Sequence, residues 1–282
     1  MDRKHDKAVK SLKNLLLYFV LVFVAIAFVF PFAWMILSSL KTPQELLRLP
    51  IQWFPKRLMI SNYLQVFQYV PFLRGLLNSS LITFTSVLGA TLISALGAYS
   101  LAKLRFKGRS LLFNIVLVAL MVPSFITLLP LYALIYKLGW LNTYLALIVP
   151  YLGSAYSIFL LRQYIITIPD NLCDAGRLDG ANEFKIFWRV ILPLTKPALV
   201  VVAFWNFFNI WNDFLWPLLV LNSPNMFTVQ LVLSGLQGYE SGVNFEGILM
   251  AGSVMSVLPT LVVYLLGQSQ MKKLYGLGGA KG

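Results

Sequence analysis

The sequence predicts an all-α polytopic membrane protein with six transmembrane helices, and its composition and its hydropathy pattern both lead to this class. Hydrophobic residues make up 59% of the 282 residues, charged residues make up only 12%, and the mean hydropathy is +0.76. A soluble globular chain carries about 25% charged residues. Intrinsic disorder is also excluded, because a disordered chain lacks the apolar side chains that a packed core requires.

Six apolar stretches are each long enough to cross roughly 30 Å of hydrocarbon, which takes about 20 helical residues. They are Leu15–Leu37, Leu76–Ala102, Leu111–Tyr136, Tyr144–Leu161, Ala198–Leu221 and Gly247–Met271. The first stretch follows a basic tail, as a signal peptide does. It is too long for a signal peptide and no small-residue cleavage site follows it, so we expect an uncleaved span.

The distribution of lysine and arginine predicts the orientation. With the N-terminus inside, seventeen basic residues fall in the inner segments and six in the outer ones. The excess follows the positive-inside rule and places both termini in the cytoplasm. We therefore expect a cytoplasmic tail over 1–14, a six-helix transmembrane domain over 15–271 and a second cytoplasmic tail over 272–282.

Counting excludes several other functions. Cys173 is the one cysteine, so the chain cannot form an internal disulfide. His5 is the one histidine and lies in the charged N-terminal tail, so the residues for a His/Cys metal site or a histidine-based catalytic triad are missing. The net charge is +13, and the basic residues are scattered between the apolar spans. In a membrane protein this distribution indicates the topology of the chain rather than nucleic-acid binding. The terminal GLGGAKG lacks the spacing and the Ser/Thr of a Walker A motif. No catalytic arrangement is found, so the chain is not expected to be an enzyme or to hold a cofactor or metal.

Prolines stand inside several spans: Pro31, Pro123, Pro130, Pro150, Pro217 and Pro259. Proline interrupts the hydrogen-bond ladder, which favours the kinked helices of a moving pathway. The alternative is that proline is simply commoner in transmembrane helices than in soluble ones.

The segment from Ile168 to Pro197 is too polar to cross the membrane and predicts two short helices around a break. Pro169-Asp170 opens the first helix, Asp179-Gly180 forms a turn, and Asn182 caps the second helix. An apolar stripe then recurs at helical spacing, and Leu192-Pro193 ends the second helix. The stripe consists of Phe184, Phe187, Trp188 and Ile191. A helix of this kind either lies on the lipid headgroups or docks into another protein, and the projecting turn favours docking.

This segment resembles the EAA loop of ABC-importer permeases. It matches that pattern at Ala175, Asp179, Gly180, Ala181, Phe187, Leu192 and Pro193, with Pro197 following. Asp174 stands where the family has Glu, and Gly176 where it has the second Ala. In the family this loop forms the coupling helices that sit in a cleft of the ATP-binding subunit. The resemblance therefore assigns coupling to Asp174, Ala175, Gly176, Asp179, Gly180, Ala181, Phe187 and Pro193.

The resemblance extends along nearly the whole chain. The chain is similar to the smaller, G-like permease subunit of maltose-type carbohydrate importers. It rests on Pro31-Phe32, Trp34, Ser39 to Pro43, Trp211 to Phe214, Trp216 to Leu218 and Gly278 to Gly282. It implies the type I ABC-importer permease fold in a bacterial or archaeal plasma (inner) membrane. It also implies a second homologous permease subunit, two ATP-binding cassette subunits that bind the ATP and Mg, and an extracytoplasmic solute-binding protein.

The fifth span carries polar and aromatic side chains that, on a continuous helix, fall within one arc of about 120°. They are Trp205, Asn206, Asn209, Asn212, Asp213 and Trp216. Amides, a carboxylate and indoles suit a carbohydrate pathway, and the alternative is interhelical hydrogen bonding that holds subunits together. The segment 222–246 carries no positive charge. By the same resemblance it is the external loop that reaches toward the solute-binding protein, and the alternative is a solvated connector.

Together these observations indicate a transmembrane permease subunit of an ATP-driven importer for a sugar or oligosaccharide, working by alternating access. Two alternatives remain: a secondary transporter driven by an ion gradient through Asp213, and an ABC-importer permease for a non-sugar solute.

Overall fold

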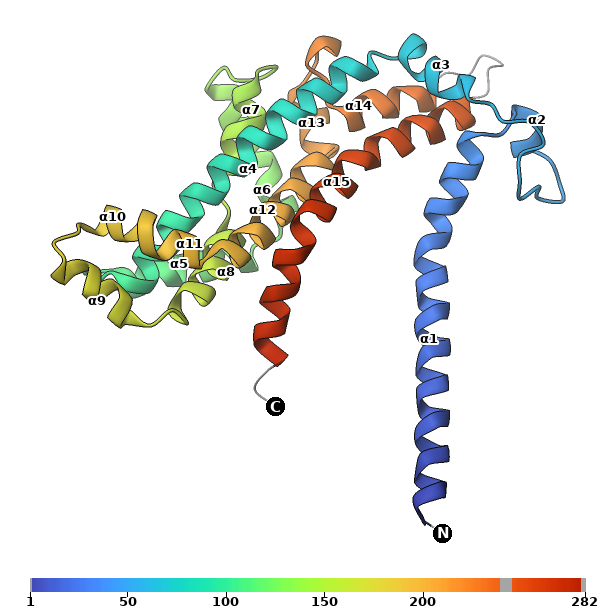
Figure 1. Cartoon of the computed structure of the whole chain (residues 1–282). Helices are drawn as coiled ribbons and strands as arrows, with labels where there is room; N and C mark the ends of the chain where they lie inside the picture. Colours follow the sequence, from blue (N-terminus) through green and yellow to red (C-terminus); the bar gives the residue numbers. More distant parts are fainter. Residues whose placement is uncertain (1, 239–244, 280–282) are drawn as a thin grey trace. The chain divides into compact units, whose positions relative to one another are not determined.

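The computed structural model describes residues 2–238 and 245–279, with side chains described over 13–236 and 245–272, and every regular element in these ranges is helical (Figure 1). The elements are α1 (Asp2–Ser39), α2 (Pro43–Leu46), α3 (Ser61–Tyr69), α4 (Phe72–Lys103), α5 (Arg109–Met121), α6 (Ser124–Lys137), α7 (Tyr144–Ile148), η1 (Val149–Leu152), α8 (Ala155–Ile166), α9 (Asp170–Leu178), α10 (Glu183–Ile186), η2 (Phe187–Ile191), α11 (Leu192–Leu194), α12 (Lys196–Trp211), α13 (Leu215–Val220), η3 (Pro224–Met226), α14 (Val229–Ser234), η4 (Gly235–Gly238) and α15 (Phe245–Gly279). The chain divides into two units, one of residues 1–70 and 235–255, the other of residues 71–234 and 256–282.

Four helices in the described part of the chain are long and apolar enough to span a membrane, or up to six if each of two bent pairs is one span. The four are Lys13–Ser39, Phe72–Lys103, Tyr144–Ile166 and Phe245–Lys272. They match the first, second, fourth and sixth predicted spans. The sixth candidate span ends at Lys272, one residue after the predicted Met271, and its helix runs on to Gly279. Residues 280–282 lie outside the described residues.

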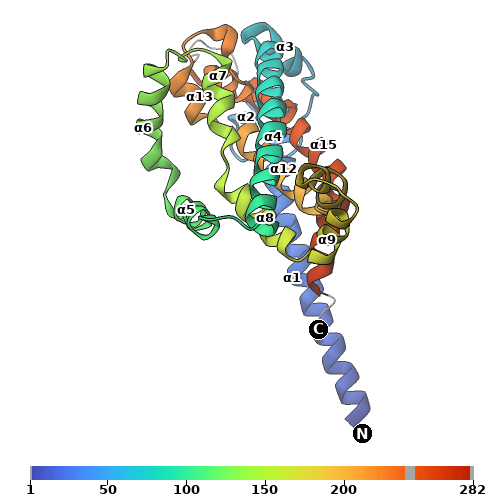
Figure 2. The same ribbon diagram turned by 90° about the vertical axis from the view of Figure 1, so that its left-hand side faces the viewer.

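The third predicted span is not one straight helix. Its halves, α5 and α6, meet at an angle of 104° around Val122 and Pro123, and Figure 2 shows the sharp bend between them. Pro123 lacks the N–H that would continue α5, and it forces Val122 into the extended region with ψ of 118°.

The fifth predicted span is also broken, because α12 ends at Trp211 and α13 begins only at Leu215. The physical reason is Pro217, which cannot donate to the carbonyl of Asp213 four residues earlier and whose ring would clash with it. The Asp213 carboxylate, one residue before the N-cap Phe214, accepts a hydrogen bond from the Trp216 N–H in the first turn of α13 at 3.3 Å. The 120° arc drawn through Trp205 and Trp216 on a continuous helix is therefore wrong.

In the first unit, polar contacts hold the segment that follows α1 against α3. Asn62 Nδ2 donates to the Ser39 carbonyl at 2.9 Å and to the Lys41 carbonyl at 3.2 Å. The Lys41 ammonium lies 4.2 Å from the centre of the Trp34 ring, a cation–π contact. In contrast, residues 13–33 of α1 are exposed throughout.

In the second unit, α4 is the central helix and packs against α8, α12 and α14. Small side chains on α4 allow this close packing, among them Ser86, Ala90, Ser94 and Ala98, all fully buried. Gly75 is tightly constrained by a neighbouring backbone as well as a side chain, because an added Cβ would lie 2.9 Å from Val232 Cγ2 and 3.2 Å from the Val229 Cα.

Replacing Gly75 with alanine should therefore lower the free energy of unfolding by about 1–3 kcal/mol, the usual cost of overpacking a core. The matched control is Gly97→Ala on the same helix, where the added Cβ would make ordinary contacts of 3.8 Å with Ile158. That control should be neutral or stabilising, since alanine favours helix over glycine. Thermal unfolding in detergent measures both variants, and equal stability would contradict the tight α4–α14 contact.

Candidate functional site: the helical loop 168–197 and a cleft between broken helices

The turn between α9 and α10 has the geometry that its glycine predicts. Gly180 has φ of +75°, and an added Cβ would meet nothing within 4 Å. Its N–H donates to the Arg177 carbonyl at 3.0 Å, and the Ala181 N–H donates to the Gly176 carbonyl at 3.0 Å. These two bonds form a Schellman motif, which ends α9 and requires the left-handed conformation that glycine adopts without strain. The predicted break is confirmed.

The second helix begins as predicted but ends later. Asn182 Oδ1 accepts from the Lys185 N–H at 2.8 Å and so caps α10. The chain then passes through the π-helical turn η2 and the short α11, so the prediction that Leu192-Pro193 ends the helix is wrong. Pro193 cannot donate to the carbonyl four residues earlier, and a widened turn before it accommodates this loss.

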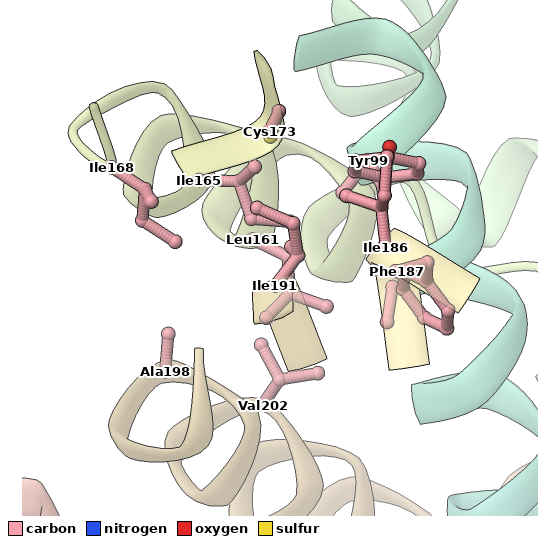
Figure 3. Close-up of a cluster of buried hydrophobic side chains, with 12 residues drawn as sticks. Tyr99, Leu161, Ile165, Ile168, Cys173, Ile186, Phe187, Ile191, Ala198 and Val202 are labelled. Carbon is pink, nitrogen blue, oxygen red and sulfur yellow. The ribbon is translucent and has the colours of Figure 1, made fainter. Parts of the chain in front are cut away.

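The apolar stripe on this helix is split between two surroundings. Phe187 and Ile191 are buried at 1% and 0% exposure, whereas Phe184 and Trp188 are 63% and 41% exposed. The predicted one-sided stripe is wrong in this respect. Figure 3 shows the buried side chains in one cluster with Tyr99 of α4. The cluster consists of Ala95, Ala98, Tyr99, Leu161, Ile165, Ile168, Cys173, Ile186, Phe187, Ile191, Ala198 and Val202.

The exposed half of the stripe forms an apolar tip together with the end of α9. Phe184 and Trp188 contact each other edge to face with ring centroids 5.9 Å apart. Leu178, the last residue of α9, is 89% exposed. Exposed large apolar side chains near a turn mark a surface suited to contact with another protein or with a membrane.

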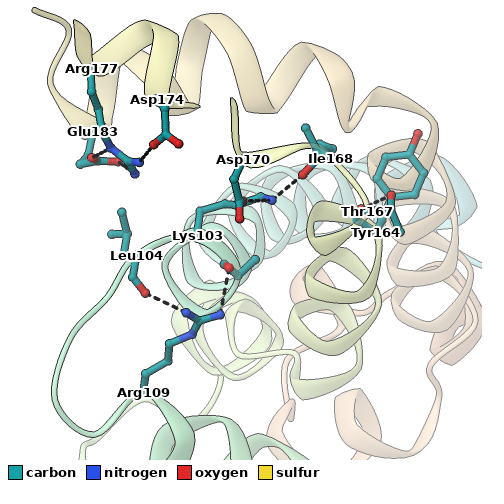
Figure 4. Close-up of polar contacts among 11 residues, drawn as sticks. Lys103, Leu104, Arg109, Tyr164, Thr167, Ile168, Asp170, Asp174, Arg177 and Glu183 are labelled. Carbon is teal, nitrogen blue, oxygen red and sulfur yellow. Dashed lines mark hydrogen bonds and ion pairs between the residues drawn. The ribbon is translucent and has the colours of Figure 1, made fainter. Parts of the chain in front are cut away.

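A buried lysine fastens this loop to α4. The Lys103 ammonium donates to the Ile168 carbonyl at 2.5 Å and to Asp170 Oδ1 at 2.6 Å, and only 4% of its side chain is exposed (Figure 4). The hydrogen bond and charge of Lys103 hold the pKa of the Asp170 carboxyl below its ordinary value. We refer to Lys103, Ile168 and Asp170 as the lysine clasp.

A second polar connection joins α4, α9 and α10. The Tyr99 hydroxyl donates to Glu183 at 2.5 Å, and Arg177 donates to Glu183 Oε1 at 2.8 Å and to Asp174 Oδ1 at 2.7 Å. The hydrogen bond from Arg177, and then that from Tyr99, lower the pKa of the Glu183 carboxyl. The stabilisation from these carboxylates is complete above the ordinary carboxyl pKa of about 4 and is lost only as the pH falls through the lowered values.

The eight residues predicted to couple occupy three kinds of position. Asp174, Ala175, Asp179, Gly180 and Pro193 are exposed, Gly176 and Ala181 are half-buried, and Phe187 is fully buried. Gly176 packs against α10, since an added Cβ would lie 3.1 Å from Ile186 Cγ1. Sequence reasoning missed Tyr99, Lys103, Arg177 and Glu183. The basic residues among them had been counted only as topology signals.

The structure separates the six predicted pathway residues. Trp205, Asn209 and Asn212 are exposed, Asn206 and Trp216 are buried, and Asp213 is half-buried. Asn209 and Asn212 each donate to a carbonyl of their own helix at 2.7 Å, and Asn206 accepts from the Ser157 hydroxyl at 3.2 Å. Asn206 thus joins α12 to α8 within this chain, and the alternative of hydrogen bonding between subunits stays a prediction.

Asp213 and Trp216 instead belong to a cleft between α6, η1 and α13, with a volume of about 340 Å³. The Tyr151 hydroxyl donates to the Asp213 carboxylate, and the Trp216 indole N–H donates to the Ala146 carbonyl at 2.9 Å. The lining residues are Ser124, Phe125, Thr127, Leu128, Leu131, Pro150, Tyr151, Asp213, Leu215 and Trp216. We call this space the bend cleft.

The start of the predicted external segment 222–246 is tied to two helices rather than loose. Asn78 of α4 donates to the Asn225 and Phe227 carbonyls at 2.9 and 3.0 Å. Asn142, before α7, accepts from the Ser223 N–H at 3.0 Å. Residues 239–244, which include Tyr239 and Asn244, lie outside the described residues.

These features define a multi-helix membrane protein with a helical loop that exposes large apolar side chains, and comparison with known proteins gives its family. Residues 89–274 match the family described as binding-protein-dependent transport system inner membrane component, and the chain belongs to that family.

Three relatives cover almost the whole chain. The arabinooligosaccharides transport system permease protein AraQ of Halalkalibacterium halodurans is 38% identical over 92% of this chain and 94% of its own length. The lactose transport system permease protein LacG of Rhizobium radiobacter is 31% identical over 93% and 94%. The sn-glycerol-3-phosphate transport system permease protein UgpE of Brucella abortus is similar at 29% identity over 92% and 94%.

The fold is also that of a solved transporter. A chain of a bacterial ABC transporter involved in the import of the acidic polysaccharide alginate superimposes with a TM-score of 0.85 at 22% identity, covering 93% of this chain and 98% of that chain. The predicted all-helical permease fold is confirmed at this level.

Replacing Lys103 with methionine should lower the free energy of unfolding by about 1–3 kcal/mol, because the buried Ile168 carbonyl loses its partner. Asp170→Asn is the matched control. It should cost less than about 1 kcal/mol, because an ion pair with an exposed carboxylate contributes little. Thermal unfolding of the two purified variants measures the difference, and an equal loss in both would show that the exposed ion pair, not the buried bond, holds the loop.

Proposed function

We propose that this chain is the permease subunit of an ATP-driven importer for a sugar or oligosaccharide and forms half of a translocation pathway that works by alternating access. The observation that carries the proposal is the helical loop 168–197, which is fastened to α4 by the lysine clasp and presents the apolar tip at its turn. A loop held rigidly on one side and exposed on the other transmits a partner's motion to the membrane helices.

The proposed partners follow from the surfaces that the chain leaves uncovered. The tip of the helical loop fits a cleft in one of two ATP-binding subunits, which bind the ATP and Mg. The exposed apolar length of α1 fits a second, homologous permease subunit within the lipid bilayer. A solved structure of the alginate transporter contains a periplasmic protein bound to an alginate pentasaccharide, and this supports a solute-binding protein as a further partner.

The proposed location is a bacterial or archaeal inner membrane, with the tails 1–14 and 272–282 and the helical loop on the cytoplasmic side and the transmembrane domain over 15–271. The positive-inside count supports this orientation. The names of the relatives, which include arabinooligosaccharide and lactose permeases, support a sugar as the substrate. A relative named for sn-glycerol 3-phosphate keeps the non-sugar alternative open.

Gly180→Val tests the coupling role of the loop. Valine at φ of +75° strains the turn by about 1–2 kcal/mol and displaces the tip from its partner. We expect the subunit still to insert and pair, whereas substrate-stimulated ATPase in liposomes should fall at least tenfold. The matched control is Gly139→Val, at φ of +68° with equally open surroundings in the α6–α7 connection. If both variants retain stimulated ATPase and co-purify with the ATPase, the loop is not the coupling element.

Asp213→Asn tests the driving force. If Asp213 lines or braces the pathway, the isosteric amide should keep ATP-dependent uptake within about threefold of wild type, because it preserves one acceptor oxygen. The measurement is uptake into reconstituted vesicles with and without ATP. Uptake driven by a proton or sodium gradient alone, and abolished in Asp213→Asn, would establish the secondary transporter instead.

A further inference from the structure

Three helix interruptions meet at the bend cleft. The chain breaks at Val122-Pro123 between α5 and α6, at η1 between α7 and α8, and at residues 212–214 between α12 and α13. Three of the six prolines predicted to kink spans stand at these breaks, namely Pro123, Pro150 and Pro217, whereas Pro31, Pro130 and Pro259 lie inside continuous helices. Irregular backbone at membrane depth is tolerated only where protein covers it or where it lines a water-filled cavity.

The side chains at these interruptions are those that a sugar needs. The Asp213 carboxylate accepts hydrogen bonds from Tyr151 and from the Trp216 N–H, and a carboxylate has about four acceptor sites, so two remain for hydroxyl groups. Ser124 and Thr127 add hydroxyls, and Phe125, 77% exposed, presents a flat apolar ring. The cleft volume of about 340 Å³ lies within the usual range of small-molecule sites.

The charge of this cleft is uncompensated. No lysine or arginine is among the described residues that line it, and no described basic side chain forms an ion pair with Asp213. The acidic residues of the helical loop differ, since Asp170, Asp174 and Glu183 each pair with a lysine or arginine. A lone carboxylate at this depth is costly against hydrocarbon and is therefore expected to face water or protein.

The cleft also lies at the end of α12 that is remote from the helical loop. Asp213 follows α12, whose 16 residues from Lys196 to Trp211 span about 24 Å. A solute that enters from the side opposite the loop therefore reaches Asp213 early.

We propose that the bend cleft is a sugar-contact site contributed by this subunit itself, and that the lone carboxylate of Asp213 restricts it to neutral sugars and repels anionic ones. The inference rests on the proposed importer function. It adds the charge class of the substrate, which differs between the printed names of the similar proteins, from lactose to sn-glycerol 3-phosphate. The hydroxyl groups of a bound neutral sugar donate hydrogen bonds to the Asp213 carboxylate, and the C–H face of the sugar packs on the Phe125 ring. A phosphate or uronate would place a second anion beside the carboxylate with no cation to balance it.

The test uses cysteine labelling in the assembled importer. Thr127→Cys places a thiol in the cleft, and two water-soluble methanethiosulfonate reagents, one carrying a trimethylammonium group and one a sulfonate, are compared by rate. Cys173 gives little background, because it is buried and burial raises the pKa of its thiol. Each rate is divided by the rate of the same reagent with a free thiol in solution. After this normalisation we expect the cationic reagent to react about fivefold faster, which corresponds to roughly 1 kcal/mol, and the preference should vanish when Asp213→Asn is added.

Two controls keep the outcome decisive. Leu129→Cys stands on the same helix, 74% exposed but outside the cleft, and should show no preference between the reagents. Ser124→Cys replaces Thr127→Cys if that variant does not assemble. Lactose or arabinotriose, whichever the wild-type importer accumulates, should slow labelling in the cleft at least threefold.

Other results distinguish failure of the sugar-contact site from failure of the proposed importer function. A cleft thiol that neither reagent reaches, or equal rates for both reagents, would overturn the charged sugar-contact site while ATP-dependent sugar uptake still supported the importer. Accumulation of sn-glycerol 3-phosphate by the wild-type importer would likewise overturn the charge restriction alone. Absence of any ATP-dependent uptake would instead contradict the proposed function itself.

Discussion

The contact on which the rest of the second unit depends is the lysine clasp between α4 and the helical loop. An ammonium group that is almost wholly withdrawn from water needs close partners, and Lys103 finds them in the Ile168 carbonyl and the Asp170 carboxylate. Because Lys103 is the last residue of α4, any displacement of α9 pulls directly on the central helix of the unit. The buried cluster around Phe187 and Tyr99 makes the same connection through packing.

The same loop is left open on its other side. The left-handed Gly180 directs the chain around a tight turn, and the apolar tip beside it has no covering partner among the described residues. In the proposed importer, this attachment behind an open apolar tip passes a partner's movement on to α4. The proline-induced break between α12 and α13 is the place where the proposed alternating access would let the angle between these helices change.

The sequence predicted the features that depend on neighbouring residues. Four of the six apolar spans, the Gly180 turn and the Asn182 cap are all local, and each lies where the pattern places it. The features it missed depend on contacts between distant segments. Burial of Phe187 but not Phe184 is decided by the position of Tyr99, and the role of Lys103 is decided by Ile168, 65 residues away. The break after Trp211 had a local signal in Pro217, but a continuous helix was assumed through it.

The central claim is that the tip of the helical loop sits on an ATP-binding subunit. A photo-crosslinking amino acid in place of Leu178 tests it most directly, because that side chain projects from the end of α9 with 89% exposure. Irradiation of membranes that contain the assembled transporter should join this chain to the ATP-binding subunit, with the yield changing when ATP is added. Crosslinks to lipid alone, with none to an ATP-binding subunit, would show that the loop lies on the membrane surface and would contradict the account.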